Sequence, residues 1–412
     1  MDASPSPSLE LVRSLTDERV LRALMRHRRL TRAELAAETG ISKPTAGESV
    51  RRLEERGLVA DTGERTPGGR GRGRVGSYYA LSAAAGTALA VSIGPAGITG
   101  ELVDAYGETV ARTERPLGRP ASPAEVAAAL ASVAATLPSA VSSAAAASVV
   151  PGVASTAAAV SSAAAASVVP AAAPAGGAFA ERRPRLAVVS AADPVDRATG
   201  RLVHLPDSPF LVGELDPVAV LAPHVAGPVT VDNDVNWAAR AEREHAGDDF
   251  AYLYLGEGLG CAIVGGGEVA RGRGGLAGEI AHLLTIGPHG RAVPFIEVFG
   301  RMGVRRPDST AIDPDALLAA TAAPAPLAAA NRRAVGLAVA GVVAAIVALA
   351  DPGLVVVGGL WGPALLGAVR AAVAELPRTV PVEAAVLRRE PALTGARRDA
   401  LDRLRDALVA AA

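Results

Sequence analysis

From residue 83 onward, short apolar runs rich in branched residues alternate with longer runs of helical spacing. Of all the features of the sequence, this alternation most narrows the range of possible folds. Strand-like runs occur at 88–93, 98–104, 109–112, 186–190, 229–231, 251–255 and 354–357. Helical runs occur at 236–245 and 398–412. Strands that alternate with helices predict an α/β fold. Half of the 412 residues are apolar, so the chain has enough apolar surface for more than one core.

Residues 334–350 form a long apolar run of alanine, valine and glycine that is almost long enough to cross a membrane. The run ends at Asp351 and Pro352, directly before the strand-like segment 353–359. A helix that feeds a buried strand in this way is typical of a core helix. We therefore predict a buried helix and no membrane contact.

The first 82 residues carry the spacing of a helix-turn-helix. A helix is expected at 16–27, and Thr31 and Glu34 form a capping box that starts a second helix. Gly40 provides a tight turn, and Ser42 caps a third helix whose first turn tolerates Pro44. The segments 57–60 and 78–81 are expected to pair as the two strands of a wing.

The third helix has one apolar face, formed by Ala46, Val50 and Leu53, and one polar face. Such a helix fits the major groove of DNA, with its first turn near base edges and its later arginines near phosphates. Between the wing strands, arginines alternate with glycines in a strip that suits a narrow minor groove. The predicted DNA-binding residues are Ser42, Lys43, Thr45, Gly47, Arg51, Arg52, Arg70, Arg72 and Arg74.

The charge distribution agrees with a DNA-binding head. Residues 1–82 carry a net charge of +4, and the remainder carries −5, which weakly favours contact between the head and a nucleic acid. The alternative is a three-helix packing domain with a basic loop. In order and chemistry, the segment closely resembles a winged helix-turn-helix repressor domain.

Residues 139–180 consist almost entirely of alanine, serine, valine, proline and glycine, and VSSAAAASVVP occurs twice, at 141–151 and 160–170. Two copies cannot build a stacked repeat core, so we expect a low-complexity insert that is mobile or weakly helical. Before it, Ser122 and Glu125 form a capping box that opens a helix to Leu137.

The remaining features narrow the class of protein. Cys261 is the only cysteine, which excludes a disulfide framework and a cysteine-rich metal site. The N-terminal segment lacks a basic stretch followed by an apolar run, so no secretory signal is expected. These features predict a cytoplasmic protein.

In the body, short polar residues follow strands or lie in loops between apolar runs. They are Asn233, Asp234, Glu279, His282 and Glu297. Carboxylates and amides in such places suit a ligand with many hydroxyl groups. Each residue also has a purely structural explanation: a turn at Asn233 and Asp234, a helix cap at Glu279, and a hydrogen-bonded core histidine at His282.

The order of these segments resembles the ROK family (repressors, open reading frames and sugar kinases) over residues 83–412 apart from the insert. The matching motifs are V-x-N-D-x-N at 231–236, L-G-x-G-L-G at 255–260, G-E-I-x-H at 278–282, D-P-x-x-V-V-x-G-G at 351–359 and P-V-D-x-A-T-G-R at 194–201. The resemblance implies an actin-like, two-lobed α/β ATPase fold with a sugar in the cleft. It implies sugar contacts from the five polar residues and places Asp234 at the general-base position of the kinases.

The chain departs from the family pattern in two places, and the first is the site where the kinases bind the phosphates of ATP. Where the kinases carry D-x-G-G-T for ATP, the chain reads Ser92-Ile93-Gly94-Pro95-Ala96, which lacks the carboxylate and the hydroxyl and, at Pro95, an N–H that a phosphate would bind. Glu257 places a negative charge where a phosphate would lie. We therefore expect no kinase activity.

The second departure concerns zinc. The family often follows its histidine with C-x-C-G-x-x-G-C, whereas His282 is followed by a shorter segment with no cysteine. Without thiolate ligands, and with only His289 as a substitute, the sequence predicts no metal site. Nothing else in the sequence then fixes the orientation of His282.

The sequence as a whole predicts a sugar-responsive transcriptional repressor that does not phosphorylate its sugar. Its expected partners are operator DNA, a sugar or sugar derivative and further copies of the chain, as a homodimer or homotetramer; no cofactor is expected. The expected units are the head at 1–82, a smaller lobe at 83–230 plus 398–412, and a larger lobe at 231–397. The alternatives are a bifunctional sugar kinase with a DNA-binding head, and a DNA-binding protein with a ligand-free body.

Overall fold

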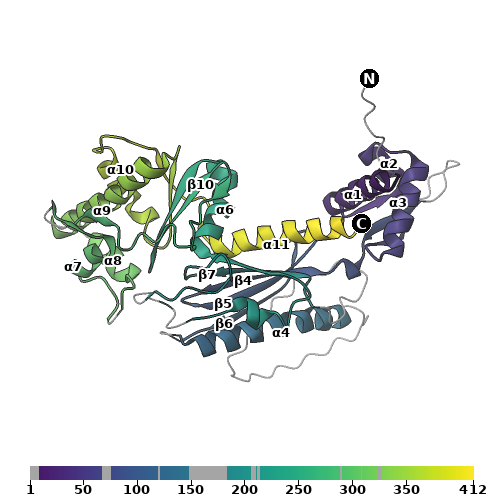
Figure 1. Cartoon of the computed structure of the whole chain (residues 1–412), viewed down its shortest axis with the longest axis horizontal. Coiled ribbons are helices and arrows are strands. Elements are labelled where there is room, and N and C mark those ends of the chain that lie inside the picture. Colours follow the sequence, from purple (N-terminus) through teal and green to yellow (C-terminus); the bar gives the residue numbers. More distant parts are fainter. Residues whose placement is uncertain are drawn as a thin grey trace, which may run out of the picture.

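The computed structural model describes residues 9–66, 76–118, 121–147, 183–205, 210, 214–287, 290–307, 309–322 and 326–412. The head lies at one end of the molecule, and the body contains two separate five-stranded sheets (Figure 1). A long C-terminal helix runs between the body and the head.

The head is a three-helix unit with a small sheet. Its elements are α1 (Leu9–His27), α2 (Arg32–Thr39), α3 (Lys43–Glu55), β1 (Arg29–Thr31), β2 (Val59–Arg65) and β3 (Ser77–Leu81). The capping box of Thr31 and Glu34 is formed, and the Ser42 side chain accepts a hydrogen bond from the Thr45 N–H. Gly40 adopts φ 69° after α2, a left-handed conformation that favours glycine.

The structure confirms the helix-turn-helix spacing and the two wing strands, which pair antiparallel from Val59 opposite Leu81. Ala46, Val50 and Leu53 are fully buried, as the pattern predicts. Two features were not predicted: α1 begins at Leu9 rather than residue 16, and β1 adds a third strand to the wing. Arg70, Arg72 and Arg74 lie outside the described residues.

The first sheet of the body has the strand order β6-β5-β4-β7-β8. Its strands are β4 (Thr87–Gly94), β5 (Gly97–Asp104), β6 (Thr109–Pro116), β7 (Leu186–Ala191) and β8 (Val229–Asn233). Helix α4 (Pro123–Ala147) packs against β5 and β6, and α5 (Pro217–Leu221) packs against α4 and β8. The start of α4 is capped by Ser122 and Glu125 as predicted. The helix continues through Pro138 into the expected insert, and residues 148–182 lie outside the described residues.

The second sheet has the order β11-β10-β9-β14-β15. Its strands are β9 (Phe250–Leu255), β10 (Leu259–Gly265), β11 (Glu268–Val269), β14 (Val355–Gly358) and β15 (Val382–Ala384). The surrounding elements are a hairpin of β12 (Leu284–Ile286) and β13 (Ala292–Pro294), and the helices α7 (Phe295–Arg301), α8 (Pro314–Ala322), α9 (Pro326–Ala350) and α10 (Leu366–Val373). Together they enclose one apolar core.

Helix α9 contains the apolar run that resembled a membrane span. By length and composition it could cross a membrane, and it is the one such helix in the part of the chain that the structure describes. Half of its most apolar stretch is buried inside the protein, where it packs against α10, α8 and β12. The prediction of a helix that packs in the core and leads into a strand is confirmed, since β14 follows directly.

Helix α6 (Asp234–Ala246) and helix α11 (Pro391–Ala410) join the parts. Helix α11 packs against α6 and against β4 and β7, and its far end reaches α1 in the head. Both helices begin earlier than the sequence indicated, α6 at Asp234 and α11 at Pro391. All of α11 therefore packs as one unit, including residues 391–397 that we had assigned to the larger lobe.

Candidate functional site

A cavity of about 450 Å³ lies between the two sheets of the body. One wall is formed by the β4–β5 turn, the loop after β7 and the first turn of α6. The opposite wall is formed by the end of β9, the β9–β10 turn and the segment 275–282. Strand ends of two sheets thus meet at one pocket, which is a common place for a ligand site in α/β proteins.

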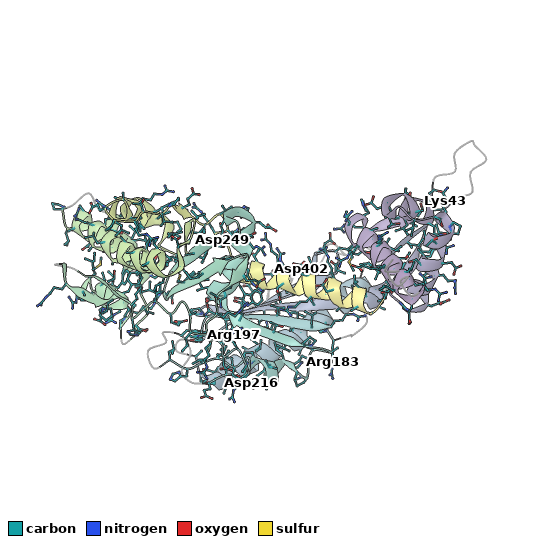
Figure 2. All side chains as sticks on the ribbon, turned by 45° about the horizontal axis from the view of Figure 1, so that its top comes forward. Lys43, Arg183, Arg197, Asp216, Asp249 and Asp402 are labelled. Carbon is teal, nitrogen blue, oxygen red and sulfur yellow. The ribbon has the colours of Figure 1, made fainter. Side chains whose placement is uncertain are left out.

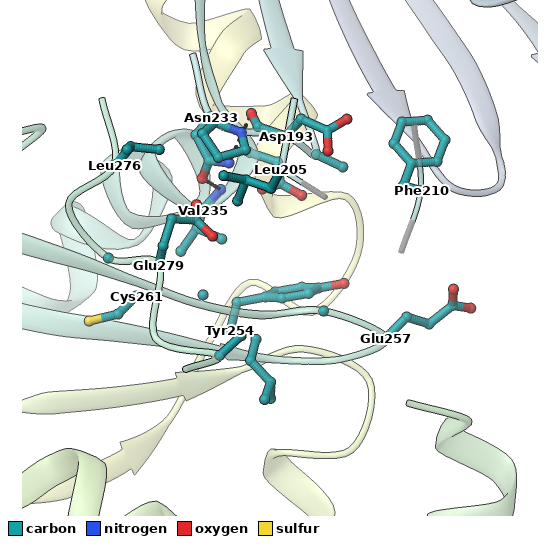
Figure 3. Close-up of a pocket in the computed structure, with 18 of the residues that line it drawn as sticks. Asp193, Leu205, Phe210, Asn233, Val235, Tyr254, Glu257, Cys261, Leu276 and Glu279 are labelled. Carbon is teal, nitrogen blue, oxygen red and sulfur yellow. Dashed lines mark hydrogen bonds between the residues drawn. The ribbon is translucent and has the colours of Figure 1, made fainter. Parts of the chain in front are cut away.

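Four of the five predicted sugar-binding residues line this cavity: Asn233, Asp234, Glu279 and His282. Figure 3 shows Asn233 and Glu279 in the pocket together with Tyr254 from the opposite sheet. The four come from segments almost fifty residues apart in sequence, and the fold brings them together. Their contact with a sugar stays a prediction.

Asn233 already uses its side chain within the protein. Its Oδ1 accepts a hydrogen bond from the Val235 N–H at 2.9 Å and so caps α6. Its Nδ2 donates to the Ala191 and Asp193 carbonyl oxygens at 3.5 and 3.3 Å. The turn explanation therefore applies to Asn233, which ties the loop after β7 to the start of α6.

Asp234 is half-buried at the first turn of α6. Dehydration of its carboxyl group, reinforced by the charges of Asp193 and Glu279, raises its pKa to about 7. The pKa of Glu279 is also raised, first by dehydration and then by Asp193. Glu279 is exposed, so water screens part of this effect.

Glu279 is held in place by the backbone of a glycine motif. The Cys261 N–H donates to the Gly278 carbonyl oxygen at 2.9 Å. Gly278 has φ 99°, and a Cβ at this position would lie 1.8 Å from the Cys261 carbonyl oxygen. Only glycine permits this approach, which sets the neighbouring carboxylate at the pocket wall.

Glu297 does not line the cavity, contrary to our prediction. It lies in the first turn of α7, where its carboxylate binds the Arg305 guanidinium at 3.3 Å. Ile296, its neighbour, contributes to the pocket instead. The helical phase of α7 turns the apolar side chain towards the pocket and the acidic one away from it.

Glu257 does not present an isolated charge to the cavity either. Its Oε1 accepts a hydrogen bond from Arg306 at 3.1 Å, and its side chain is 15% exposed. The guanidinium neutralises the carboxylate, so repulsion of a phosphate by Glu257 is weaker than the sequence suggested.

The β4–β5 turn is a tight hairpin. Gly94 pairs with Gly97, and Pro95 and Ala96 form the tip, which lines the cavity. This is the place where the resemblance puts the ATP phosphates. The tip offers one N–H, from Ala96, and no carboxylate or hydroxyl group.

The pocket lining also contains residues that the sequence analysis did not identify, among them Asp193, Tyr254 and Leu276. Asp193 is the second residue after β7, and a polar residue close to a strand end is a signal that could have identified it. Tyr254 lies inside an apolar run that looked like an ordinary strand. Among the described side chains, no group of three or more histidine, cysteine, aspartate or glutamate residues is arranged to hold a metal ion; His289 lies outside them.

The outer surface of the head presents the polar end of α3. Lys43 lies on the side of the head that faces away from the body (Figure 2), and Ser42, Thr45 and Arg51 are exposed beside it. Arg51 binds Glu48 at 2.8 Å and Glu55 at 2.6 Å along the helix. Gly47 is half-buried.

Arg52 does not face outwards as expected. Its Nε donates to Asp17 at 3.0 Å, and the Asp17 side chain is 1% exposed. Ser49, fully buried, donates to the same carboxylate. Arg52 therefore joins α3 to α1, and we remove it from the predicted DNA-binding residues.

A family model described as the ROK family matches residues 88–294, half of the chain. The chain belongs to the ROK family. A second model, described as winged helix-turn-helix DNA-binding, matches residues 13–60. The head of this ROK protein is therefore a DNA-binding domain of that type, as the sequence predicted.

Solved structures support the same fold at low sequence identity. A ROK family transcriptional regulator, a homologue of the E. coli MLC protein, is 18% identical and covers 97% of this chain and 99% of its own, with a TM-score of 0.59. A ROK hexokinase from Thermus thermophilus is 23% identical and covers 78% and 99%, with a TM-score of 0.53. The fold of this ROK protein is therefore the two-lobed, actin-like α/β fold that we expected.

Similarity to a curated protein is limited to one segment. A glucokinase from Halalkalibacterium halodurans is 45% identical over 69 residues, which is 16% of this chain and 21% of the glucokinase. The match thus spans about a fifth of that relative. The family contains both regulators and sugar kinases.

Proposed function

We propose that this ROK protein is a transcriptional repressor that binds a sugar in the body cavity and does not phosphorylate it. The observation that carries this proposal is the combination of a DNA-binding head with a cavity whose phosphate-side turn consists of Gly94-Pro95-Ala96-Gly97. Asp234, Glu279 and His282 are the proposed sugar contacts, and Asn233 supports them by fixing the start of α6.

The absence of phosphoryl transfer rests on the turn. A kinase must hold Mg²⁺ and the phosphates of ATP with carboxylates, hydroxyls and backbone N–H groups. The hairpin tip replaces these with Pro95 and Ala96. Arg306 neutralises Glu257, so the proposed absence of phosphoryl transfer does not depend on the charge of Glu257.

The DNA contacts come from the exposed end of α3. Lys43, Thr45 and Arg51 are exposed, and small or cationic residues at this end suit a major groove and its flanking phosphates. We propose that two copies of the chain bind a near-palindromic operator in the cytoplasm, since half-sites one helical turn apart match a two-fold protein dimer.

The first test combines two measurements on the full chain. Thermal shift is recorded against a panel of neutral, amino, acetylated and phosphorylated sugars, and operators selected from genomic DNA are used in gel shifts with and without each hit. We expect a sugar that raises Tm and also changes operator affinity. If no sugar changes either signal, the sensing part of the proposal is wrong.

A kinase with a DNA-binding head is the second candidate, and one observation favours it. Asp234 is retained, and with a pKa of about 7 it could accept a proton from a sugar hydroxyl. Sugar-dependent ADP release, lost in Asp234→Asn, would establish the kinase. We expect no release above that of the variant.

A further inference from the structure

The turn between β5 and β6, residues 104–108, joins the body to the head through polar contacts. The Tyr106 hydroxyl group donates a hydrogen bond to the Arg28 carbonyl oxygen at 3.2 Å and accepts one from the Leu81 N–H at 2.9 Å. Arg28 directly follows α1, and Leu81 is the last residue of β3. One side chain of the body therefore holds both a helix end and a strand end of the head.

The side chain of Arg28 adds a second contact with the same turn. Its guanidinium binds the Glu108 carboxylate at 2.5 Å and lies over the Tyr106 ring, 5.5 Å from the ring centre. The two partners of the ion pair are 53% and 39% exposed, so the pair contributes little stability. Arg28 also has φ 66°, a conformation that favours glycine over residues with a side chain. An arginine at this position is therefore explained by its contact with the turn and not by the stability of the head.

The turn itself is fixed within the body. The Asp104 side chain is 4% exposed, and it accepts hydrogen bonds from the N–H groups of Tyr106 and Glu108 at 3.0 and 2.9 Å. From α11, Arg405 donates to the Ala105 carbonyl oxygen at 3.0 Å. Tyr106 therefore has a rigid support, and a movement of the turn moves its hydroxyl group as well.

The contacts with the turn are directional, unlike the apolar contact between the head and the body. Val20 and Leu24 of the head share an apolar core with Leu404 and Leu408 of α11. Burial of apolar surface holds two parts together but has no preferred direction. Hydrogen bonds weaken steeply away from their preferred geometry. The apolar core thus explains why the head stays attached, and the Tyr106 contacts explain why it has one angle.

Strand β5 connects this turn to the cavity. Pro95 and Ala96 line the cavity, β5 begins at the next residue, Gly97, and it ends at Asp104. The strand pairs with β4 on one side and with β6 on the other. Its eight residues span about 27 Å. Because the strand is held along both edges, a displacement of the hairpin tip is carried along it to Tyr106.

We propose that Tyr106 is a positioning residue that sets the angle of the head on the body, and that a ligand in the cavity changes this angle through β5. The second half rests on the proposed function, because it takes the cavity as the sensing site. The first half depends on neither sugar nor DNA. The two halves are therefore tested separately.

The first test measures the distance between the head and the body by double electron–electron resonance. Spin labels are attached to Arg19→Cys in α1 and Ala128→Cys in α4, both at exposed positions, and the labelled full chain is diluted with unlabelled chain. Cys261 is 4% exposed and does not take a label. We expect one narrow distance distribution in the otherwise unchanged chain. Tyr106→Phe, which keeps the ring and removes the hydroxyl group, should widen it at least about two-fold.

Two further variants complete this test. Arg28→Gly removes the contact with Glu108 and fits φ 66°, so the head should stay folded while the distribution widens. Tyr252→Phe is the matched control, since it removes a buried hydroxyl group of β9 that has no hydrogen-bond partner among the described residues; it should keep the narrow distribution. An unchanged distribution in Tyr106→Phe would overturn the positioning role. If Tyr106→Phe does not fold, Arg28→Gly decides the same question.

The second test measures how strongly the cavity and the head are coupled. Operator affinity is measured by fluorescence anisotropy with and without the sugar that raises Tm. We expect the sugar to change the affinity of the wild type by about five- to 150-fold. In Tyr106→Phe this change should fall to within about two-fold, while isothermal titration gives an unchanged affinity for the sugar alone. A purely structural role would lower the affinity for the sugar as well and would overturn the proposal.

The remaining outcomes separate the proposal from the proposed function. A variant that retains the full effect of the sugar on operator affinity would overturn the route through β5 and leave the sensing function intact. If no sugar changes the operator affinity of the wild type, the sensing function fails and the second half of the proposal fails with it. The distance measurement then still decides whether Tyr106 sets the angle of the head.

Discussion

Asp234 is a carboxyl group whose pKa is strongly raised by its surroundings. Its carboxyl has a pKa of about 7 in the folded chain against a usual value of 3.8. The folded state therefore binds this proton more tightly than the unfolded state. The ionised Asp234 carboxylate therefore destabilises the folded state. This destabilisation has its full size above pH 7, shrinks as the pH falls from about 7 to 4, and is absent below pH 4.

We therefore expect Asp234→Asn to be more stable than the wild type at pH 8, by about 1–3 kcal/mol. The difference should shrink as the pH is lowered to 5. Urea unfolding at several pH values, followed by circular dichroism, measures it. Glu257→Gln is the control: its carboxylate is paired with Arg306, so this variant should be less stable than the wild type at pH 8. A constant difference across pH would contradict the assignment.

At the same scale, Lys43 is an exposed cation at the start of α3. Lys43→Ala should weaken operator binding and reduce the slope of log affinity against log salt by about one, because one phosphate contact is lost. Gel shifts at several salt concentrations measure this slope. Arg333→Ala, in α9 of the body, is the matched control and should leave the slope unchanged.

At the scale of elements, α3 is held to α1 through Asp17. This carboxylate is buried and accepts hydrogen bonds from Ser49 and Arg52. Removing one partner of a buried pair leaves the other charge uncompensated.

Asp17→Ala should therefore lower the free energy of unfolding of the part of the protein that contains the head by about 3–5 kcal/mol and abolish DNA binding. Arg51→Ala, which breaks only exposed pairs along α3, should change stability by less than about 0.5 kcal/mol. Urea unfolding of both variants tests the comparison. Similar losses in the two would refute the structural role of Asp17.

Elements with local signals were predictable from the sequence. Each capping box is a signal only four residues long: Thr31 with Glu34 marks the start of α2, and Ser122 with Glu125 marks the start of α4. Both capping boxes are formed in the structure. Helix α1 was predicted too short, because its N-terminal part exposes Leu11 and Leu15 and has no single apolar face.

The sequence predicted only part of the candidate site and of the DNA-binding surface, because some side chains are paired with residues far away in the sequence. Motif order identified Asp234, Glu279 and His282, which line one cavity. The partner of Arg52 lies 35 residues away in sequence, and the partner of Glu257 lies 49 residues away. Spacing along the chain carries no information about such long-range ion pairs, so neither correction could be made before the fold was known.

For the whole molecule, the apolar core of the head continues into the body. Val20 and Leu24 of the head belong to the same buried cluster as Leu404 and Leu408 of α11 and Trp237 of α6. A core shared in this way predicts that the head and the first sheet of the body unfold together.

Leu404→Ala should lower stability by about 2–4 kcal/mol, because the side chain is fully buried. It should also split a single thermal transition into two, since the shared core is weakened. Differential scanning calorimetry of the full chain records both effects. Leu349→Ala, at an 89% exposed position, should change neither. One undivided transition in Leu404→Ala would show that the head does not depend on this contact.

The close contact between α6 and α11 has a geometric consequence. A Cβ at Gly395 would lie 2.0 Å from the Trp237 carbonyl oxygen, so the two helix backbones touch near the cavity end of α11. Helix α11 has 20 residues and is therefore about 30 Å long. If α11 tilted as a rigid rod about Gly395, a tilt of about 5° would move the far end, beside α1, through about 2 Å. A small change in the angle between α6 and α11 would in that case become a displacement of about 2 Å beside the DNA-binding head.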